Sequence, residues 1–123
     1  MKIKKLLIKT KDGRNIEIKV ERAESFFSKV FGLMLRKKLE QNSGMLFVFD
    51  TPERYGIWNM LTLIPLDVIF ISKDMKIIGM EKLPVSILPT KTIYPNSAAK
   101  YILELNAGFI EVNNLNVEDK IEF

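Results

Sequence analysis

The sequence predicts a β-rich α+β domain: a compact, antiparallel, barrel-like meander with a short helix after an N-terminal hairpin and a short helical turn near the C-terminus. Its 123 residues are enough for one substantial hydrophobic core and too few for two. Apolar residues mostly alternate with polar ones or form runs of strand length, and only one segment changes clearly to helical spacing. We therefore treat residues 1–123 as a single domain.

The chain opens with the pattern of a β-hairpin. Residues 2–10 and 14–21 are alternating runs rich in β-branched side chains, separated by Lys11-Asp12-Gly13. An Asp-Gly pair between two such runs is a strong hairpin signal. Ile16, Ile18 and Val20 share one face of the second run, so this strand is expected to have one core face and one solvated face.

The period then changes to that of a helix. Between Ala23 and Leu35, apolar side chains recur at three- and four-residue spacing, as an amphipathic helix requires. The basic run Arg36-Lys37-Lys38 follows, and cations are favourable at the negative end of a helix dipole. We expect one short helix over residues 23–35.

Two nearly continuous apolar runs, residues 44–49 and 66–71, have the length and composition of strands buried on both faces. The rest of the chain is interpreted as strands over 55–60, 77–83, 100–105 and 119–123, a helical turn over 108–114 and an irregular stretch over 84–98 with three prolines. Long ordered loops in compact domains are often functional.

Composition excludes several kinds of chemistry. The chain has no cysteine and no histidine, so disulfides, thiolate catalysis, cysteine-ligated metals and a histidine general base are excluded. Catalysis would have to use carboxylates, lysine, tyrosine or hydroxyls. No phosphate-binding glycine loop, dinucleotide fingerprint or calcium loop occurs. We expect no metal site and no cofactor.

Charge is unevenly distributed along the chain. Residues 1–41 carry 12 Lys and Arg against 5 Asp and Glu, a net charge of +7, whereas residues 42–123 carry 7 against 10, a net charge of −3. A basic segment can bind nucleic acid, but lysines on the open faces of strands also maintain solubility and protect sheet edges. No apolar run reaches the length of a membrane span or a signal-peptide core, so we expect a cytoplasmic protein without a membrane partner.

Two carboxylates lie in apolar strand-like segments, Asp67 after Pro65 and Glu104 two residues after Ile102. Burying a charge is costly unless it is paired or hydrogen-bonded. Asp67 is either a structural carboxylate held by backbone hydrogen bonds or an ion pair, or a ligand-binding or catalytic group. Glu104 either faces solvent, pairs with a cation such as Arg36 or Lys100, or serves a site.

Trp58, the only tryptophan, lies beside Asn59. An aromatic ring next to polar side chains is the usual material of a cleft for a sugar or another ring, although a single tryptophan is also common in cores. Tyr94, in the proline-rich stretch, is a candidate of the same kind.

Four blocks resemble the family called domain of unknown function 192. They are Gly32-Leu33-Met34-Leu35-Arg36, Gly44-Met45-Leu46-Phe47-Val48-Phe49, Trp58 with Thr62-Leu63-Ile64-Pro65-Leu66-Asp67-Val68-Ile69-Phe70-Ile71, and Tyr101-Ile102-Leu103-Glu104-Leu105-Asn106-Ala107-Gly108. The resemblance spans nearly the whole chain. It implies a compact β-rich α+β domain and no particular activity.

The chain departs from the family pattern at two places. Members commonly read Trp-Met-Lys-Asn-Thr before the Pro-Leu-Asp block, whereas this chain has Met60 and Leu61 in the places of the lysine and the asparagine. Members often carry a cysteine pair near the loop that here contains Pro89 and Tyr94. Any family site that uses those side chains is altered here.

The leading hypothesis is a non-enzymatic binding module for a small polar ligand such as a carbohydrate. One alternative is a hydrolase that uses Asp67 and Glu104 as a carboxylate pair. Another, the least favoured, is a nucleic-acid binder that uses the basic N-terminal hairpin. The residues expected to bind a ligand are Arg36, Trp58, Thr62, Asp67, Tyr94 and Glu104.

Overall fold

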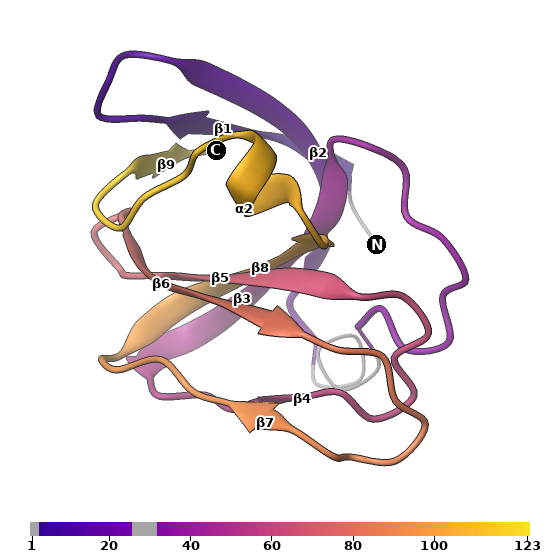
Figure 1. Cartoon of the computed structure of the whole chain (residues 1–123). Coiled ribbons are helices and arrows are strands. Elements are labelled where there is room, and N and C mark those ends of the chain that lie inside the picture. The colour runs from indigo at the N-terminus through magenta and orange to yellow at the C-terminus, as the bar shows by residue number, and fades with distance from the viewer. Residues whose placement is uncertain (1–2, 26–31) are drawn as a thin grey trace.

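The computed structural model describes residues 3–25 and 32–123 and has a curled seven-stranded sheet at its centre (Figure 1). The strand order is β6-β5-β8-β3-β2-β1-β9, and β4 and β7 form a separate two-stranded ribbon. The elements are β1 (Ile3–Lys9), β2 (Asn15–Ala23), β3 (Ser43–Glu53), β4 (Ile57–Trp58), β5 (Leu66–Ile71), β6 (Ile77–Leu83), β7 (Thr92–Ile93), β8 (Ala99–Asn106), α2 (Phe109–Val112) and β9 (Lys120–Glu122). Within these described residues no helix is long and apolar enough to cross a membrane. The cytoplasmic location stays a prediction.

The N-terminal hairpin is confirmed. β1 and β2 pair antiparallel, with Leu6 opposite Ile18 and Ile8 opposite Ile16. Gly13 in the connecting turn has a φ of 90°, a conformation that glycine adopts without steric cost. Leu6, Ile8 and Ile18 are buried and Ile16 is half-buried. The alternating pattern therefore places one face of the hairpin in the core, as expected.

The helix expected over residues 23–35 is a wrong prediction where the structure describes that range. Ala23 is the last residue of β2 and pairs with Phe47, and residues 32–35 form turns. Gly32 and Leu35 have φ values of 45° and 62°, which are incompatible with a right-handed helix. Residues 26–31, which carry most of the helical spacing, lie outside the described residues. The helical turn over 108–114 is confirmed by α2.

The sheet is not a simple antiparallel meander. β2 and β3 pair in parallel, with Val20 opposite Gly44, and β8 lies between β5 and β3 although it follows both in sequence. A parallel pair cannot be joined by a tight hairpin and needs a longer crossover connection between β2 and β3. The pattern within each strand indicates that it is a strand but does not specify its neighbour.

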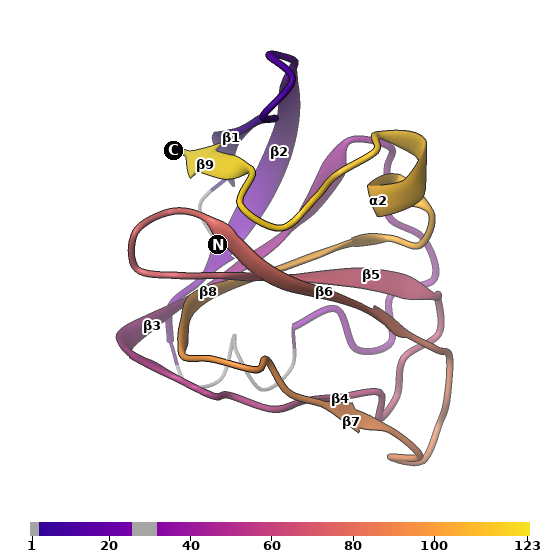
Figure 2. The same cartoon turned by 60° about the vertical axis from the view of Figure 1, so that its left-hand side comes forward.

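The sheet curls like a half-barrel, and its two edge strands meet at one end (Figure 2). The backbone N–H of Ile77, at the start of β6, donates a hydrogen bond of 2.9 Å to the carbonyl of Asp119. The backbone N–H of Ile121, in β9, donates one of 2.8 Å to the carbonyl of Met75. These bonds satisfy edge groups that would otherwise be available for pairing with another chain.

The curled sheet has two differently covered faces, visible in Figure 2 as α2 on one side and the β4–β7 ribbon on the other. Alternate residues of a strand point to opposite faces, so β5 and β8 contribute to both. We call the face covered by α2 the helix face and the face covered by the β4–β7 ribbon the ribbon face. The buried cluster on the helix face consists of Leu6, Ile8, Ile18, Val20, Leu46, Ile69, Ile71, Ile77, Leu103, Leu105, Leu115 and Ile121. The buried cluster on the ribbon face consists of Ala23, Leu33, Met45, Phe47, Leu66, Val68, Phe70, Leu83, Ile93, Ala99 and Ile102.

Candidate functional site

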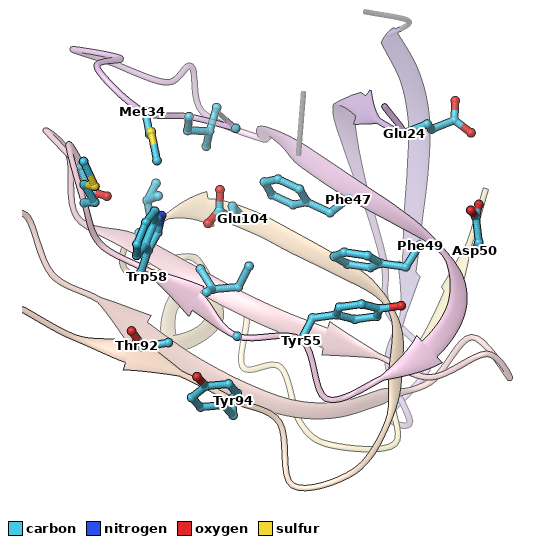
Figure 3. Close-up of a pocket in the computed structure, with 17 residues that line it drawn as sticks. Glu24, Met34, Phe47, Phe49, Asp50, Tyr55, Trp58, Thr92, Tyr94 and Glu104 are labelled. Atoms are coloured by element: carbon cyan, nitrogen blue, oxygen red, sulfur yellow. The ribbon is translucent and has the colours of Figure 1, made fainter. Parts of the chain in front are cut away.

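A pocket of about 790 Å³ opens on the ribbon face (Figure 3). Side chains from β3, from the β4–β7 ribbon and from β8 line it, together with Gly32, Leu33 and Met34 of the turn before β3. The volume lies within the range of pockets that hold small organic molecules. The pocket is therefore the best candidate for a binding site among the described residues.

Aromatic rings form much of the pocket wall. Phe47 and Phe49 lie two residues apart on β3 and therefore point to the same face. The ring of Tyr55 stacks on Phe49, with ring centroids 3.7 Å apart and planes inclined by 11°. Figure 3 shows Trp58 at the opposite end of the pocket from this stack, with Glu104 and Phe47 between them. An apolar ring system can thus be held along the pocket.

Two glycines allow rings to lie directly against the backbone. A Cβ at Gly56 would lie 2.5 Å from Cε1 of Tyr94, closer than real Cβ atoms approach other atoms. A Cβ at Gly32 would lie 2.9 Å from Cζ of Phe47 and 3.7 Å from Oε1 of Glu104. Any larger residue at either position would displace a ring that shapes the pocket.

Of the charged residues that the structure describes in the pocket lining, Glu104 is the most buried. Its residue is only 5% exposed, and it lies on β8 between Met45 of β3 and Val68 of β5. Among the described residues none donates a hydrogen bond to its carboxyl or forms an ion pair with it. Burial disfavours the ionised form and raises the pKa of Glu104 to about 7. Near neutral pH this carboxyl exists in both protonation states.

Asp67 is held by backbone hydrogen bonds. The residue is 1% exposed, and its Oδ2 accepts hydrogen bonds from the N–H groups of Gly108 at 3.1 Å and Ile110 at 3.0 Å. Gly108, with a φ of 96°, precedes α2, so Asp67 fixes the start of this helical turn to β5. The structural interpretation of Asp67 fits this arrangement, and the residue does not line the pocket.

The carboxylate pair needed for the hydrolase alternative does not form. In the register between β5 and β8, Asp67 lies opposite Leu105 and Glu104 lies opposite Val68. Asp67 therefore points to the helix face and Glu104 to the ribbon face, and the sheet separates them. Nor does the part of the chain that the structure describes contain a group of three or more acidic side chains able to hold a metal ion.

The other expected site residues divide between the pocket and its surroundings. Trp58 and Tyr94, exposed by 46% and 56%, and the buried Thr62 all line the pocket. Arg36 does not, because its guanidinium binds Glu21 in a bidentate ion pair with N–O distances of 2.7 and 3.2 Å. This pairing raises the pKa of Arg36 and stabilises its charge. The structure therefore brings together Trp58, Thr62, Tyr94 and Glu104 and leaves out Arg36 and Asp67.

Cations that sequence reasoning offered as partners of Glu104 are engaged elsewhere. Arg36 binds Glu21, and Nζ of Lys100 donates to the carbonyl of Asp50 over 3.2 Å. Lys100 also lies 5.9 Å from the centroid of the Tyr101 ring. Neither cation lines the pocket, so neither neutralises the buried carboxyl.

Sequence reasoning did not identify Phe47, Phe49, Tyr55 or Met60 as lining residues. Both phenylalanines fall in the continuous apolar run 44–49, which indicated a strand buried on both faces. The useful signal was their spacing of two residues, which places both rings on one face. Nothing in the local pattern shows that this face opens into a pocket.

A buried amide fixes the proline-rich loop beside the pocket. Asn59 is fully buried, and its Oδ1 accepts hydrogen bonds from the N–H groups of Thr90 and Lys91, both at 3.0 Å. Its Nδ2 donates to Oγ1 of Thr90 at 2.9 Å and to the carbonyl of Pro84 at 3.2 Å. These bonds anchor the loop next to Trp58 and Thr62.

The first departure from the family pattern, at Met60 and Leu61, falls at and beside this pocket. Met60, in the place of the common lysine, lines it. Leu61, in the place of the asparagine, has a φ of 54°, a region in which asparagine is favoured over leucine. Its carbonyl accepts a hydrogen bond of 2.8 Å from Leu35, which also has a positive φ.

Similar proteins share this architecture over nearly the full chain. A protein provisionally described as a transcription regulator, from Sinorhizobium meliloti, superimposes with a TM-score of 0.93 and 29% identity, covering 98% of this chain and 93% of that one. A protein of unknown function from Novosphingobium aromaticivorans gives a TM-score of 0.89 at 24% identity over 98% and 85% of the two chains, a likeness of fold alone.

Comparisons of sequence also find relatives over most of the chain. A UPF0127 protein of Pyrococcus abyssi is 30% identical over 109 residues, 87% of each chain. The model of the DUF192 family, described as an uncharacterised ACR, matches residues 7–123, which include the β3, β5 and β8 segments around the pocket and Asp67. The chain therefore belongs to the DUF192 family.

Proposed function

We propose that this protein is a non-enzymatic binding domain and that a small organic ligand occupies the ribbon-face pocket. One observation carries the proposal: Glu104 is a buried carboxyl without a partner among the described residues, in the wall of an open pocket lined by aromatic rings. A buried polar group left unsatisfied costs free energy, and a ligand that supplies its partner recovers that cost.

The lining favours a ligand with an apolar body over a sugar. The half-exposed indole of Trp58 and the hydroxyls of Thr62 and Thr92 are suitable for stacking and orienting a carbohydrate ring. A sugar, however, presents many hydroxyls that need partners, and most of the wall consists of rings and aliphatic side chains. Carbohydrates therefore form one class to test beside flat or aromatic compounds.

The proposal is tested by thermal shift with a panel of sugars, amines, aromatic acids and alcohols. A compound that binds only the native state must raise the melting temperature. We expect at least one compound to do so and to change the emission of Trp58, which is the only tryptophan and lines the pocket.

Two variants locate the binding. Trp58→Ala should abolish the thermal shift, whereas Val112→Ala, at an 84% exposed position on α2, should retain it. A panel without any stabilising compound would contradict the proposal, as would a Trp58→Ala variant that keeps the full shift.

Nucleic-acid binding is the second candidate, because the Sinorhizobium relative is provisionally described as a transcription regulator. The net charge of +7 over residues 1–41 favours it. Several of these cations are already paired, with Lys5 bound to Glu17 at 2.9 Å and Lys9 to Glu122 at 2.8 Å. Affinity for duplex or single-stranded DNA would have to fall steeply with salt. No retardation in a gel at about 50 mM salt, where such contacts are strong, would exclude it.

A further inference from the structure

The charged side chains among the described residues that line the pocket are all acidic: Glu24, Asp50 and Glu104. The chain as a whole is basic, with 19 Lys and Arg against 15 Asp and Glu. An acidic pocket in a basic protein concentrates negative potential at one place. Cationic molecules are therefore attracted to it and anionic ones are repelled.

The nearby cations do not reach the deepest of these carboxyls. Nη2 of Arg22 lies 3.3 Å from Oε1 of Glu24 at the outer end of the pocket. Arg36 forms an ion pair with Glu21. Glu104, which is at least nine-tenths buried, has no cationic partner among the described residues. A carboxyl in this position points into the pocket and has no counter-ion within residues 3–25 and 32–123.

The rings beside Glu104 add a second preference for positive charge. The face of an aromatic ring carries negative partial charge and attracts ammonium and guanidinium groups, most strongly for tryptophan. Figure 3 shows Glu104 between Trp58 and Phe47, with the stacked pair Phe49 and Tyr55 further along. The same rings provide apolar area for the uncharged part of a ligand.

Building on the proposed binding function, we propose that the ligand is a small organic cation, an amine or quaternary ammonium on an apolar or aromatic body. Its positive charge lies against the carboxyl of Glu104 and the face of Trp58, and its apolar body extends along Phe47 toward Phe49 and Tyr55. The proposal rests on three features together: the buried carboxyl without a partner, the acidic lining and the aromatic wall.

Binding of such a cation depends on pH through Glu104. The charged ligand binds the ionised carboxylate, and burial raises the pKa of Glu104 to about 7. The ionised fraction of a group with that pKa rises about tenfold between pH 6 and pH 8. Of the described residues, the other titratable ones that line the pocket are Glu24, Asp50, Tyr55 and Tyr94. The strands on either side of Glu104 present Met45 and Val68, which do not titrate.

Three probes that share a phenyl ring and differ in charge test the proposal: 2-phenylethylamine, 2-phenylethanol and phenylacetate. Binding is measured through Trp58 emission and, independently, by calorimetry at pH 6, 7 and 8. We expect the amine to bind at least tenfold more tightly than the alcohol and phenylacetate to bind least. The affinity of the amine should rise about tenfold from pH 6 to pH 8, because the carboxylate population rises by that factor.

Variants assign the effect to Glu104. Glu104→Gln should lose at least tenfold in affinity for the amine and should lose the pH dependence. Met60→Lys, which introduces a cation into the lining, should weaken amine binding and leave alcohol binding less affected. Glu81→Gln removes an exposed carboxylate on β6 outside the pocket and should behave as the wild type does.

The outcomes separate the two proposals. If the alcohol binds as tightly as the amine, or if amine affinity does not change with pH, the cation proposal is wrong while the binding function stands. If neither these probes nor any compound of the wider panel binds, both are wrong. Should Glu104→Gln fail to fold, the pH series on the wild type and the Met60→Lys comparison still decide.

Discussion

Leu103 and Glu104 are consecutive residues of β8, and they point to opposite faces of the same sheet. On the helix face, Leu103 packs in a fully buried apolar cluster that α2 and the C-terminal segment cover. On the ribbon face, Glu104 lines a pocket. One face of the sheet is filled by its own side chains, and the other leaves space. The difference shows how a strand in the middle of a small domain can serve the core and a binding site at once.

Two buried carboxyls, those of Asp67 and Glu104, sharpen this contrast. Asp67 on the helix face accepts two backbone hydrogen bonds and holds the start of α2. Glu104 on the ribbon face has no such partner among the described residues, and its pKa is raised by burial. Similar chemistry on neighbouring strands therefore stabilises the fold in one place and is held available in the other.

The largest effect is expected for Leu103→Ala on the filled face. Leu103 is fully buried, so its truncation removes apolar contacts and leaves a cavity. We expect a loss of about 3 kcal/mol in the free energy of unfolding, measured by urea denaturation. Val112→Ala, at an exposed position, is the control and should change it by less than about 0.5 kcal/mol. A loss below about 1 kcal/mol for Leu103→Ala would mean that the helix face is not tightly packed.

Glu104→Gln, unlike Leu103→Ala, should stabilise the protein. The gain should appear only as the pH rises above about 4.5, where the unfolded chain releases the Glu104 proton. The folded protein retains the Glu104 proton up to about pH 7, whereas the unfolded chain releases it near pH 4.5. The folded state therefore binds more protons in this window, and wild-type stability falls as pH rises from 4.5 to 7. Removing the charge should recover up to about 3 kcal/mol at pH 8 and little at pH 4.

This prediction is checked by denaturation of both proteins from pH 4 to pH 8. Glu81→Gln is the matched control, since this exposed carboxylate should leave the pH profile unchanged. A Glu104→Gln variant less stable than the wild type at pH 8 would show that the ionised carboxylate of Glu104 makes stabilising contacts in the folded protein, as Oδ2 of Asp67 does.

Asp67→Ala should destabilise the protein by about 1–3 kcal/mol, because the N–H groups of Gly108 and Ile110 would lose their acceptor while buried. Asp67→Asn retains one acceptor oxygen and should cost less. The measurement is the midpoint of chemical denaturation for the two variants. An unchanged midpoint for Asp67→Ala would overturn the structural role and remove the contrast with Glu104.

The smallest effect is expected for Trp58→Ala. Its indole is larger than the side chain of Leu103, but it is 46% exposed on the pocket wall and contributes less buried area than its size suggests. We expect the free energy of unfolding, measured by urea denaturation, to fall by no more than about 1 kcal/mol. The variant should also lose ligand binding. A loss comparable to that of Leu103→Ala would assign Trp58 to the core, the other interpretation that the sequence left open.

Local sequence patterns determined most of the secondary structure. The alternation in residues 14–21 and the Asp12-Gly13 turn predicted the hairpin, because strand period and turn geometry depend on adjacent residues. The apolar run 66–71 coincides with β5, and α2 falls within the expected turn. The same patterns identified Asp67 and Glu104 as carboxylates in apolar strands.

The tertiary structure decided how these strands are arranged and what their side chains meet. Residues 44–49 are apolar throughout, so their pattern could not show that Phe47 and Phe49 face a pocket. The parallel pairing of β2 with β3 depends on a crossover that neither strand encodes locally.

Strand parity indicates that residues 67 and 104 each point to one face of a sheet, but the relation between the two strands is fixed only by their register. That register, set by long-range packing rather than by neighbouring residues, separates Asp67 from Glu104 and places Glu104 beside Trp58. The sequence by itself therefore identified Asp67 and Glu104 as carboxyls within apolar strands, and it left open whether Glu104 faces solvent. Only the tertiary structure decided which one accepts backbone hydrogen bonds and which lines a pocket, because a hydrogen-bond partner is supplied by segments distant in the chain.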